Sequence, residues 1–235
     1  MRNNQVLLIT GTSRGIGKFL AEKYCEKGIN VVGFSRSNAT INSDYYTHVV
    51  GDILDEGSIK NCFGLIKQKF GQLDVLINNA GVASMNHTLL TPYKTLENIF
   101  KTNFYGSFIF SREAAKLMRK KNFGRIINFS TVAVPLNLEG EAVYASSKSA
   151  IETLTKIMAK ELAPFGITVN CIGPSPIMTD LIKVVPKDKI DELINKQAVK
   201  RFAQPDDVYH VINFFIDEKS SLITGQTIYL AGIFK

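Results

Sequence analysis

Short runs of apolar residues alternate along the chain with longer segments in which apolar residues recur every three or four positions. A short continuous run is typical of a strand buried on both faces of a sheet, and the longer period predicts an amphipathic helix. The runs predict seven strands, at residues 6–10, 31–34, 47–50, 75–78, 125–129, 168–172 and 227–230. The segments between them predict helices at residues 15–27, 58–70, 96–120, 143–162 and 206–216.

This alternation predicts an α/β fold: a three-layer, Rossmann-type, doubly wound sheet of seven mainly parallel strands with helices on both faces. A chain of 235 residues with 45% hydrophobic content can bury one large core, so residues 1–235 are expected to form a single domain. The lysine-rich residues 180–200 follow a strand end on the expected ligand side and predict a substrate lid. The alternative is an ordinary pair of exposed helices.

The net charge of +7 permits attraction to anions but does not choose among them. Basic residues form only short groups at residues 116–121 and 196–201, with no nucleic-acid motif beside them, so solvated helices are expected and no nucleic-acid partner. There is no apolar run of about 18 residues and no secretory signal pattern, which predicts a cytoplasmic protein without membrane association. Cys25, Cys62 and Cys171 are widely spaced and predict neither disulfides nor a metal site.

A glycine-rich turn follows the first predicted strand. Residues 10–17 read Thr-Gly-Thr-Ser-Arg-Gly-Ile-Gly, with glycines at Gly11, Gly15 and Gly17. Glycines let the backbone approach a pyrophosphate, and the N-terminus of the next helix supplies N–H groups and a favourable dipole. The turn therefore indicates a dinucleotide site, although a lone glycine-rich turn is weak evidence.

Tyr144 and Lys148 lie four residues apart in the predicted helix over residues 143–162, so both side chains project from one face. An ammonium beside a tyrosine, with a cationic cofactor ring nearby, favours the phenolate and would lower the pKa of Tyr144 toward the working range. The pair predicts a tuned proton donor. The alternative is a chance pair, with the lysine solvated and the tyrosine packed.

Four ordered motifs together closely resemble the short-chain dehydrogenase/reductase family over about residues 6–230. These are the glycine-rich turn, Asn78-Asn79-Ala80-Gly81 after the fourth strand, Asn103 in the long helix, and Tyr144 with Lys148. The resemblance implies an oxidoreductase that transfers a hydride between a nicotinamide and a carbonyl carbon. Among relatives, the pattern is nearest to 3-oxoacyl-[acyl-carrier-protein] reductases and similar ketone or sugar reductases.

The resemblance also implies catalytic roles. Tyr144 would be the general acid or base, Lys148 would bind the nicotinamide ribose and tune Tyr144, and Asn103 would hold a water that links Lys148 to solvent. The family's catalytic serine falls at Thr131, which is preceded by Ser130. Because neighbouring strand residues face opposite ways, only one of the two hydroxyls is expected to reach a substrate. Thr131 is the expected one; the alternative is that Thr131 is structural and Ser130 polarises the carbonyl.

Arg14 in the glycine-rich turn and Arg36 after the second strand favour NADPH/NADP over NADH, since guanidinium groups suit a 2′-phosphate and no carboxylate stands at that strand end. Pro174-Ser175 departs from the family's usual Pro-Gly. By resemblance, the cofactor contacts are Gly11, Ser13, Arg14, Gly15, Ile16, Gly17, Arg36, Asp52, Ile53, Asn79, Ala80, Gly81, Tyr144, Lys148, Pro174, Ile177 and Thr179.

Substrate and partners follow from the resemblance alone. The expected substrate is a small-molecule or carrier-linked ketone, such as a 3-oxoacyl thioester or a keto sugar. Arg125 matches a basic position that the acyl-carrier reductases use to meet their acidic carrier, whereas Phe165 stands where a second arginine is often found. A homo-oligomer, tetramer or dimer, is expected through the helices at residues 96–120 and 143–162.

The sequence thus favours an NADPH-dependent carbonyl reductase in which Tyr144 protonates the substrate oxygen. A catalytically weak dinucleotide-binding sensor or scaffold is the alternative, motivated by Thr131 and Ser175. The intact Tyr144, Lys148 and Asn103 argue against it, because a sensor has no need of a proton relay.

Overall fold

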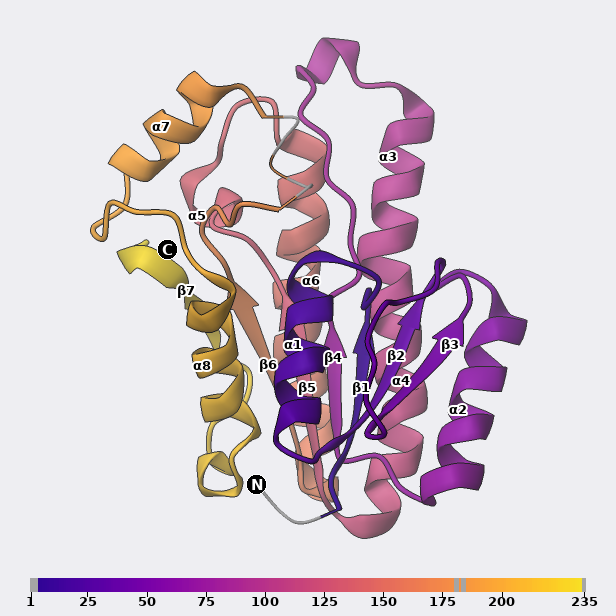
Figure 1. The fold of residues 1–235 in the computed structure, drawn as a ribbon. Helices are drawn as coiled ribbons and strands as arrows, with labels where there is room; N and C mark the ends of the chain where they lie inside the picture. The colour runs from indigo at the N-terminus through magenta and orange to yellow at the C-terminus, as the bar shows by residue number, and fades with distance from the viewer. Residues whose placement is uncertain (1–3, 180–181, 183–184, 234–235) are drawn as a thin grey trace.

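The computed structural model describes residues 4–179, 182 and 185–233, which form one seven-stranded parallel sheet with helices on both faces (Figure 1). The strand order is β3-β2-β1-β4-β5-β6-β7, and every neighbouring pair is parallel. The predicted Rossmann-type fold is therefore confirmed. The strands are β1 (Val6–Thr10), β2 (Asn30–Ser35), β3 (Tyr46–Val50), β4 (Val75–Asn78), β5 (Gly124–Phe129), β6 (Ile167–Gly173) and β7 (Thr227–Tyr229).

Helices follow most strands and cover the sheet as the predicted pattern requires. The α-helices are α1 (Gly15–Glu26), α2 (Glu56–Phe70), α3 (Tyr93–Phe100), α4 (Gly106–Met118), α5 (Ala133–Leu136), α6 (Ala142–Leu162), α7 (Lys187–Asn195) and α8 (Pro205–Ile216). Short 3₁₀ turns are η1 (Thr88–Leu90), η3 (Arg119–Lys121), η4 (Ala163–Phe165), η5 (Glu218–Ser220) and η6 (Leu230–Gly232). The π-helical turn η2 (Lys101–Tyr105) joins α3 to α4.

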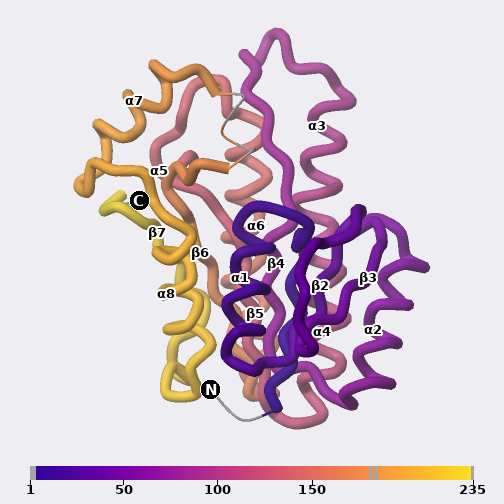
Figure 2. The backbone as a smooth tube through the Cα atoms, in the orientation of Figure 1, coloured from indigo at the N-terminus to yellow at the C-terminus, as the bar shows by residue number. Residues whose placement is uncertain are grey.

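The two faces of the sheet carry separate apolar clusters, and β1 contributes to both. Val6 and Leu8 pack with α2, α4 and α6, while Leu7 and Ile9 pack with α1 and α8. This alternation is the period-two geometry of a strand, and it explains why β1 reads as continuously apolar. Helices α1 and α8, far apart in the sequence, lie side by side on one face (Figure 2).

The strand order reverses direction at β1, whose neighbours are β2 on one side and β4 on the other. The connections after β1 and β4 therefore run to opposite faces of the sheet. They leave a crevice at the carboxyl ends of these two strands, which is where open α/β sheets bind ligands. Helix α7 and the short helix α5 lie at this end of the sheet (Figure 1).

Two elements differ from the sequence-based predictions. The single helix predicted over residues 96–120 contains the π-helical turn η2, which inserts one extra residue into the helical repeat. Helix α5 was not predicted, because four residues are too few to show a helical period. Part of the predicted lid, residues 180, 181, 183 and 184, lies outside the described residues; α7 forms most of the remainder.

In the described part of the chain, no helix is both long enough and apolar enough to cross a bilayer. The three cysteines are buried and unpaired. Burial raises the pKa of Cys62 and of Cys171 to about 12, so these thiols stay protonated at neutral pH.

Candidate active site

A cavity of about 960 Å³ lies at the carboxyl ends of the central strands. The segments that follow β1 to β6 contribute to its wall, together with α6 and α7. The structure brings most of the predicted site residues together here. They are Gly11, Ser13, Arg14, Gly15, Ile16, Arg36, Asp52, Ile53, Asn79, Ala80, Gly81, Ser130, Thr131, Tyr144, Lys148, Pro174, Ile177 and Thr179.

The glycine-rich turn is held against the end of β4. Gly11 has a φ of +79°, which favours glycine, and the Asn79 amide donates to the carbonyl oxygens of Thr10 and Gly11 at 2.9 and 3.3 Å. Gly17 does not line the cavity. A Cβ at Gly17 would overlap with the Gly11 carbonyl oxygen and the Asn79 amide, so this glycine lets helix α1 pack closely on the turn.

The region after β2 carries positive charge and hydroxyl groups toward the cavity. Arg36 lies one residue after β2, and Ser35, Ser37 and Asn38 line the cavity beside it. None of these residues is acidic. Arg14 approaches the cavity from the turn after β1. Together with the glycine-rich turn, this positive charge fits the phosphates of a dinucleotide.

Helix α6 bonds to the end of β5 through successive turns. The Lys148 ammonium donates to the Phe129 carbonyl at 2.8 Å, and a single oxygen of the buried Glu152 accepts from the Ser130 hydroxyl and the Tyr229 hydroxyl, both at 2.5 Å. These bonds join α6 to the end of β5 and to β7. They therefore fix the path of the chain directly after β5.

Ser130 and Thr131 have different hydrogen-bond partners. Ser130 is 3% exposed, and its hydroxyl donates to Glu152. The Thr131 hydroxyl lies on the side of Tyr144, whose pKa it lowers, and it accepts from the Ala133 amide at 3.3 Å. Of the two alternatives left by the sequence, Thr131 is the one beside Tyr144.

The protein alone sets the protonation of Tyr144 and Lys148 mainly through burial. Burial, and then the negative charge of Glu141, raise the pKa of Tyr144, and the Thr131 hydroxyl only partly opposes them. Burial lowers the pKa of Lys148 to about 8. The predicted lowering of the Tyr144 pKa by Lys148 is not among the effects that act on Tyr144 in this structure.

Asn103 lies behind the cavity rather than in its wall. It is fully buried in the π-helical turn, where its amide nitrogen donates to the Val82 carbonyl and the Ser147 hydroxyl, both at 3.0 Å. Its amide oxygen accepts from the Val82 amide at 2.9 Å. Asn103 thus fixes the loop after Gly81 to α6, and its role in a water relay remains a prediction.

Sequence reasoning missed two polar groups in the cavity. The Ser175 hydroxyl is buried, and neither it nor Oε2 of Glu141 has a hydrogen-bond partner among the described residues. Ser175 stood out as a departure from Pro-Gly, but only as a loop restraint. Glu141 carried a usable signal, because it lies three residues before Tyr144, at helical spacing.

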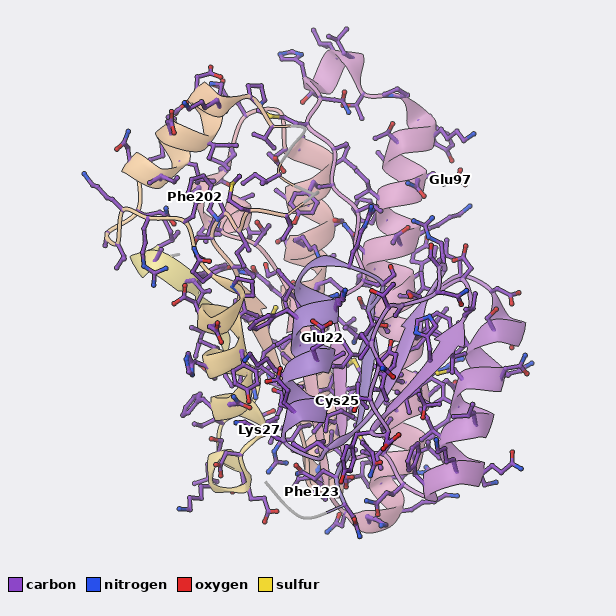
Figure 3. All side chains as sticks on the ribbon, viewed as in Figure 1. Glu22, Cys25, Lys27, Glu97, Phe123 and Phe202 are labelled. Carbon is purple, nitrogen blue, oxygen red and sulfur yellow. The ribbon has the colours of Figure 1, made fainter. Side chains whose placement is uncertain are left out.

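The prediction that Arg125 meets an acidic carrier is wrong for this structure. Arg125 is 2% exposed, its guanidinium donates to the carbonyls of Gly124 and Gly166, and it stacks 4.5 Å over the Phe123 ring. Phe123 lies at the end of the sheet opposite to α7 (Figure 3). The Arg125 guanidinium therefore makes its contacts inside the protein, away from the cavity.

Comparisons with known proteins agree with this geometry. The model of the family described as Enoyl-(Acyl carrier protein) reductase matches residues 11–232. The 3-oxoacyl-[acyl-carrier-protein] reductase FabG of Buchnera aphidicola is 36% identical over 231 residues, covering 96% of this chain and 95% of that protein. The FabG of Vibrio cholerae is 33% identical, covering 97% of this chain and 96% of that protein.

The chain belongs to the short-chain dehydrogenase/reductase family.

Solved structures extend the relationship to the whole fold of this short-chain dehydrogenase/reductase. The 3-ketoacyl-(acyl-carrier-protein) reductase of Brucella melitensis, complexed with NADH, superposes with a TM-score of 0.90 at 26% identity and covers 97% of each chain. A provisionally assigned gluconate dehydrogenase of Agrobacterium tumefaciens superposes with a TM-score of 0.88 at 26% identity. The match covers 97% of this chain and 94% of the other. The chain is thus an oxidoreductase of this family.

Gly17→Ala tests the packing of the glycine-rich turn. The added methyl group must displace the Gly11 carbonyl or the Asn79 amide, so we expect a loss of about 1–3 kcal/mol in the free energy of unfolding. Dinucleotide affinity, measured by fluorescence titration, should fall with it. Gly64→Ala is the control, since a Cβ there meets nothing within 4 Å. Equal behaviour of the two variants would contradict this role of Gly17.

Proposed function

We propose that this chain is an NADPH-dependent carbonyl reductase that converts a ketone to an alcohol. The observation that carries the proposal is the position of the Thr131 and Tyr144 hydroxyls on the wall of one cavity, with Lys148 on the same helix face as Tyr144. The bound cofactor supplies the hydride. The residues of the chain bind and orient the ketone and deliver the proton.

The two hydroxyls divide the work on the substrate oxygen. The raised pKa of Tyr144 keeps its hydroxyl protonated, as a proton donor for reduction must be. Thr131 donates a hydrogen bond that orients the carbonyl and stabilises the negative charge that develops on its oxygen. Lys148, held by the Phe129 carbonyl, stabilises with its positive charge the phenolate that Tyr144 becomes once it has given up its proton.

The choice of NADPH rests on charge at the end of β2. Arg36 and Arg14 line the cavity there, and a guanidinium binds a 2′-phosphate through charge-assisted hydrogen bonds. A carboxylate, which would accept the ribose hydroxyls and repel a phosphate, is absent from residues 35–38. NADH remains the alternative, because the similar Brucella melitensis reductase was solved with NADH.

Two classes of ketone substrate are supported by the similar proteins. The FabG relatives favour a 3-oxoacyl thioester, and the similarity to a provisionally assigned gluconate dehydrogenase favours a keto sugar. Burial of Arg125 removes one argument for an acidic carrier. Of the two residues that motivated the sensor alternative, Thr131 and Ser175, Thr131 keeps its hydroxyl on the cavity wall with Tyr144, which favours the reductase.

We also propose a homo-oligomer, as the family resemblance implies. Exposed apolar side chains on the two helices concerned support it: Phe108 on α4 is 40% exposed and Ile157 on α6 is 50% exposed. An interface through these helices would cover both.

The proposed reaction is tested by following NADPH oxidation with 3-oxoacyl thioesters, 2-enoyl thioesters, keto sugars and simple ketones. We expect reduction of ketones, and a fall of at least about 100-fold in Tyr144→Phe, because the proton donor is lost. Dinucleotide binding should be largely unchanged. Tyr93→Phe, at a residue 78% exposed, is the control. Turnover that survives in Tyr144→Phe would show that the proton comes from another group.

Arg36→Asp tests the cofactor preference. A carboxylate at this position repels a 2′-phosphate, so we expect the KM for NADPH to rise roughly tenfold to hundredfold, with the KM for NADH unchanged or lower. The same change in charge at the exposed Arg119, near the opposite end of the sheet, should leave both constants unchanged. A parallel change for both cofactors would count against recognition of the phosphate by Arg36.

A further inference from the structure

Glu141 stands directly before helix α6, three residues ahead of Tyr144, and lines the same cavity. Its backbone is fixed on both sides: its amide donates to the Leu138 carbonyl at 3.2 Å, and its carbonyl accepts from the Ala145 amide at 2.7 Å. Side chains three positions apart on a helix have Cβ atoms about 5–6 Å apart. Glu141 and Tyr144 therefore face neighbouring parts of one bound ligand.

One carboxyl oxygen of Glu141, Oε2, is shielded from solvent and accepts no hydrogen bond from the described residues. Burial raises its pKa to about 7, so it still carries appreciable negative charge at neutral pH. A buried acceptor without a partner is unfavourable, so a ligand that donates a hydrogen bond to it is favoured over one that does not.

Three cations of the cavity wall have partners other than Glu141. Lys189 and Lys196 of α7 pair with Glu192 at 3.3 and 2.7 Å. The Lys148 ammonium donates to the Phe129 carbonyl. No ion pair joins Glu141 to any cation in the described part of the chain. A donor group on a ligand can therefore bind Oε2 without competing with these three cations.

The geometry points to Glu141 as a specificity-determining residue that accepts a hydrogen bond from a hydroxyl group one or two carbons from the reacting carbonyl. This assignment rests on the proposed reduction, because Tyr144 marks the position of the carbonyl oxygen. It selects hydroxyketones, the class to which keto sugars belong. A 3-oxoacyl thioester has no hydroxyl on the carbons beside its ketone, so it leaves Oε2 without a partner.

The test compares two ketones that differ only in a donor: 4-hydroxy-2-butanone and its methyl ether, 4-methoxy-2-butanone. We expect wild-type kcat/KM to favour the hydroxyketone at least about tenfold, and Glu141→Met to reduce this preference by roughly tenfold to hundredfold. Methionine removes the unpaired oxygen, so the variant is expected to fold. Any effect of the lost charge on Tyr144 acts on both ketones and cancels in the ratio.

Glu139→Met is the matched control. Glu139 lines the same cavity two residues earlier, but it is exposed to solvent and has no buried oxygen without a partner. The preference for the hydroxyketone should stay unchanged in this variant. A loss as large as that in Glu141→Met would overturn the assignment, because it would show a general effect of acidic charge.

A binding measurement separates this inference from the proposed reaction. In protein saturated with oxidised dinucleotide no hydride is available, and dissociation constants of the two ketones follow from NMR titration. Tighter binding of the hydroxyketone that is lost in Glu141→Met supports the assignment, whether or not any ketone is reduced. Absence of reduction would overturn only the proposed reductase activity. No preference in the wild-type protein, or equal loss for both ketones, overturns the role of Glu141.

Discussion

The hydrogen bonds between helix α6 and the end of strand β5 are the constraint on which the site depends. One stripe of α6, at positions 148, 152 and 155, bonds to three consecutive residues: the Asn128 amide donates to Thr155 at 2.9 Å, Lys148 donates to the Phe129 carbonyl, and Ser130 donates to Glu152. Helix and strand are thereby locked in one relative position. This lock determines the positions of two further residues. Tyr144 lies one helical turn before Lys148, and Thr131 directly follows Ser130.

This arrangement uses buried polar groups where apolar packing would be more stabilising. Lys148 and Glu152 are 5% and 2% exposed, and burial of such groups is costly unless hydrogen bonds compensate it. The compensation is specific: each group finds its partner only in one register of α6 on β5. The pKa of Lys148 is lowered to about 8, which shows that burial still disfavours its charged form despite the hydrogen bond. Stability is given up for a defined position of the reactive hydroxyls.

Much of the fold and of the cavity was predictable from the sequence, because buried parallel strands and a glycine-rich turn are local patterns. The π-helical turn around Asn103 was not, since one extra residue barely alters the helical period. The directions of Ser130 and Thr131 depend on where β5 ends and on Glu152, 22 residues later. The burial of Arg125 depends on the Gly166 carbonyl and the Phe123 ring, so residue type alone suggested a surface charge.

Comparison of kcat/KM for Thr131→Val and Ser130→Ala on the best ketone substrate tests this account most directly. Valine keeps the shape of threonine and removes the hydroxyl, so Thr131→Val should lose about 100-fold or more, with dinucleotide affinity retained, and Thr131→Ser should restore much of the rate. Ser130→Ala should lose far less, because Glu152 keeps its hydrogen bond from Tyr229. The reverse order of losses would show that Ser130 contacts the substrate and that the role given to the bond between α6 and β5 is wrong.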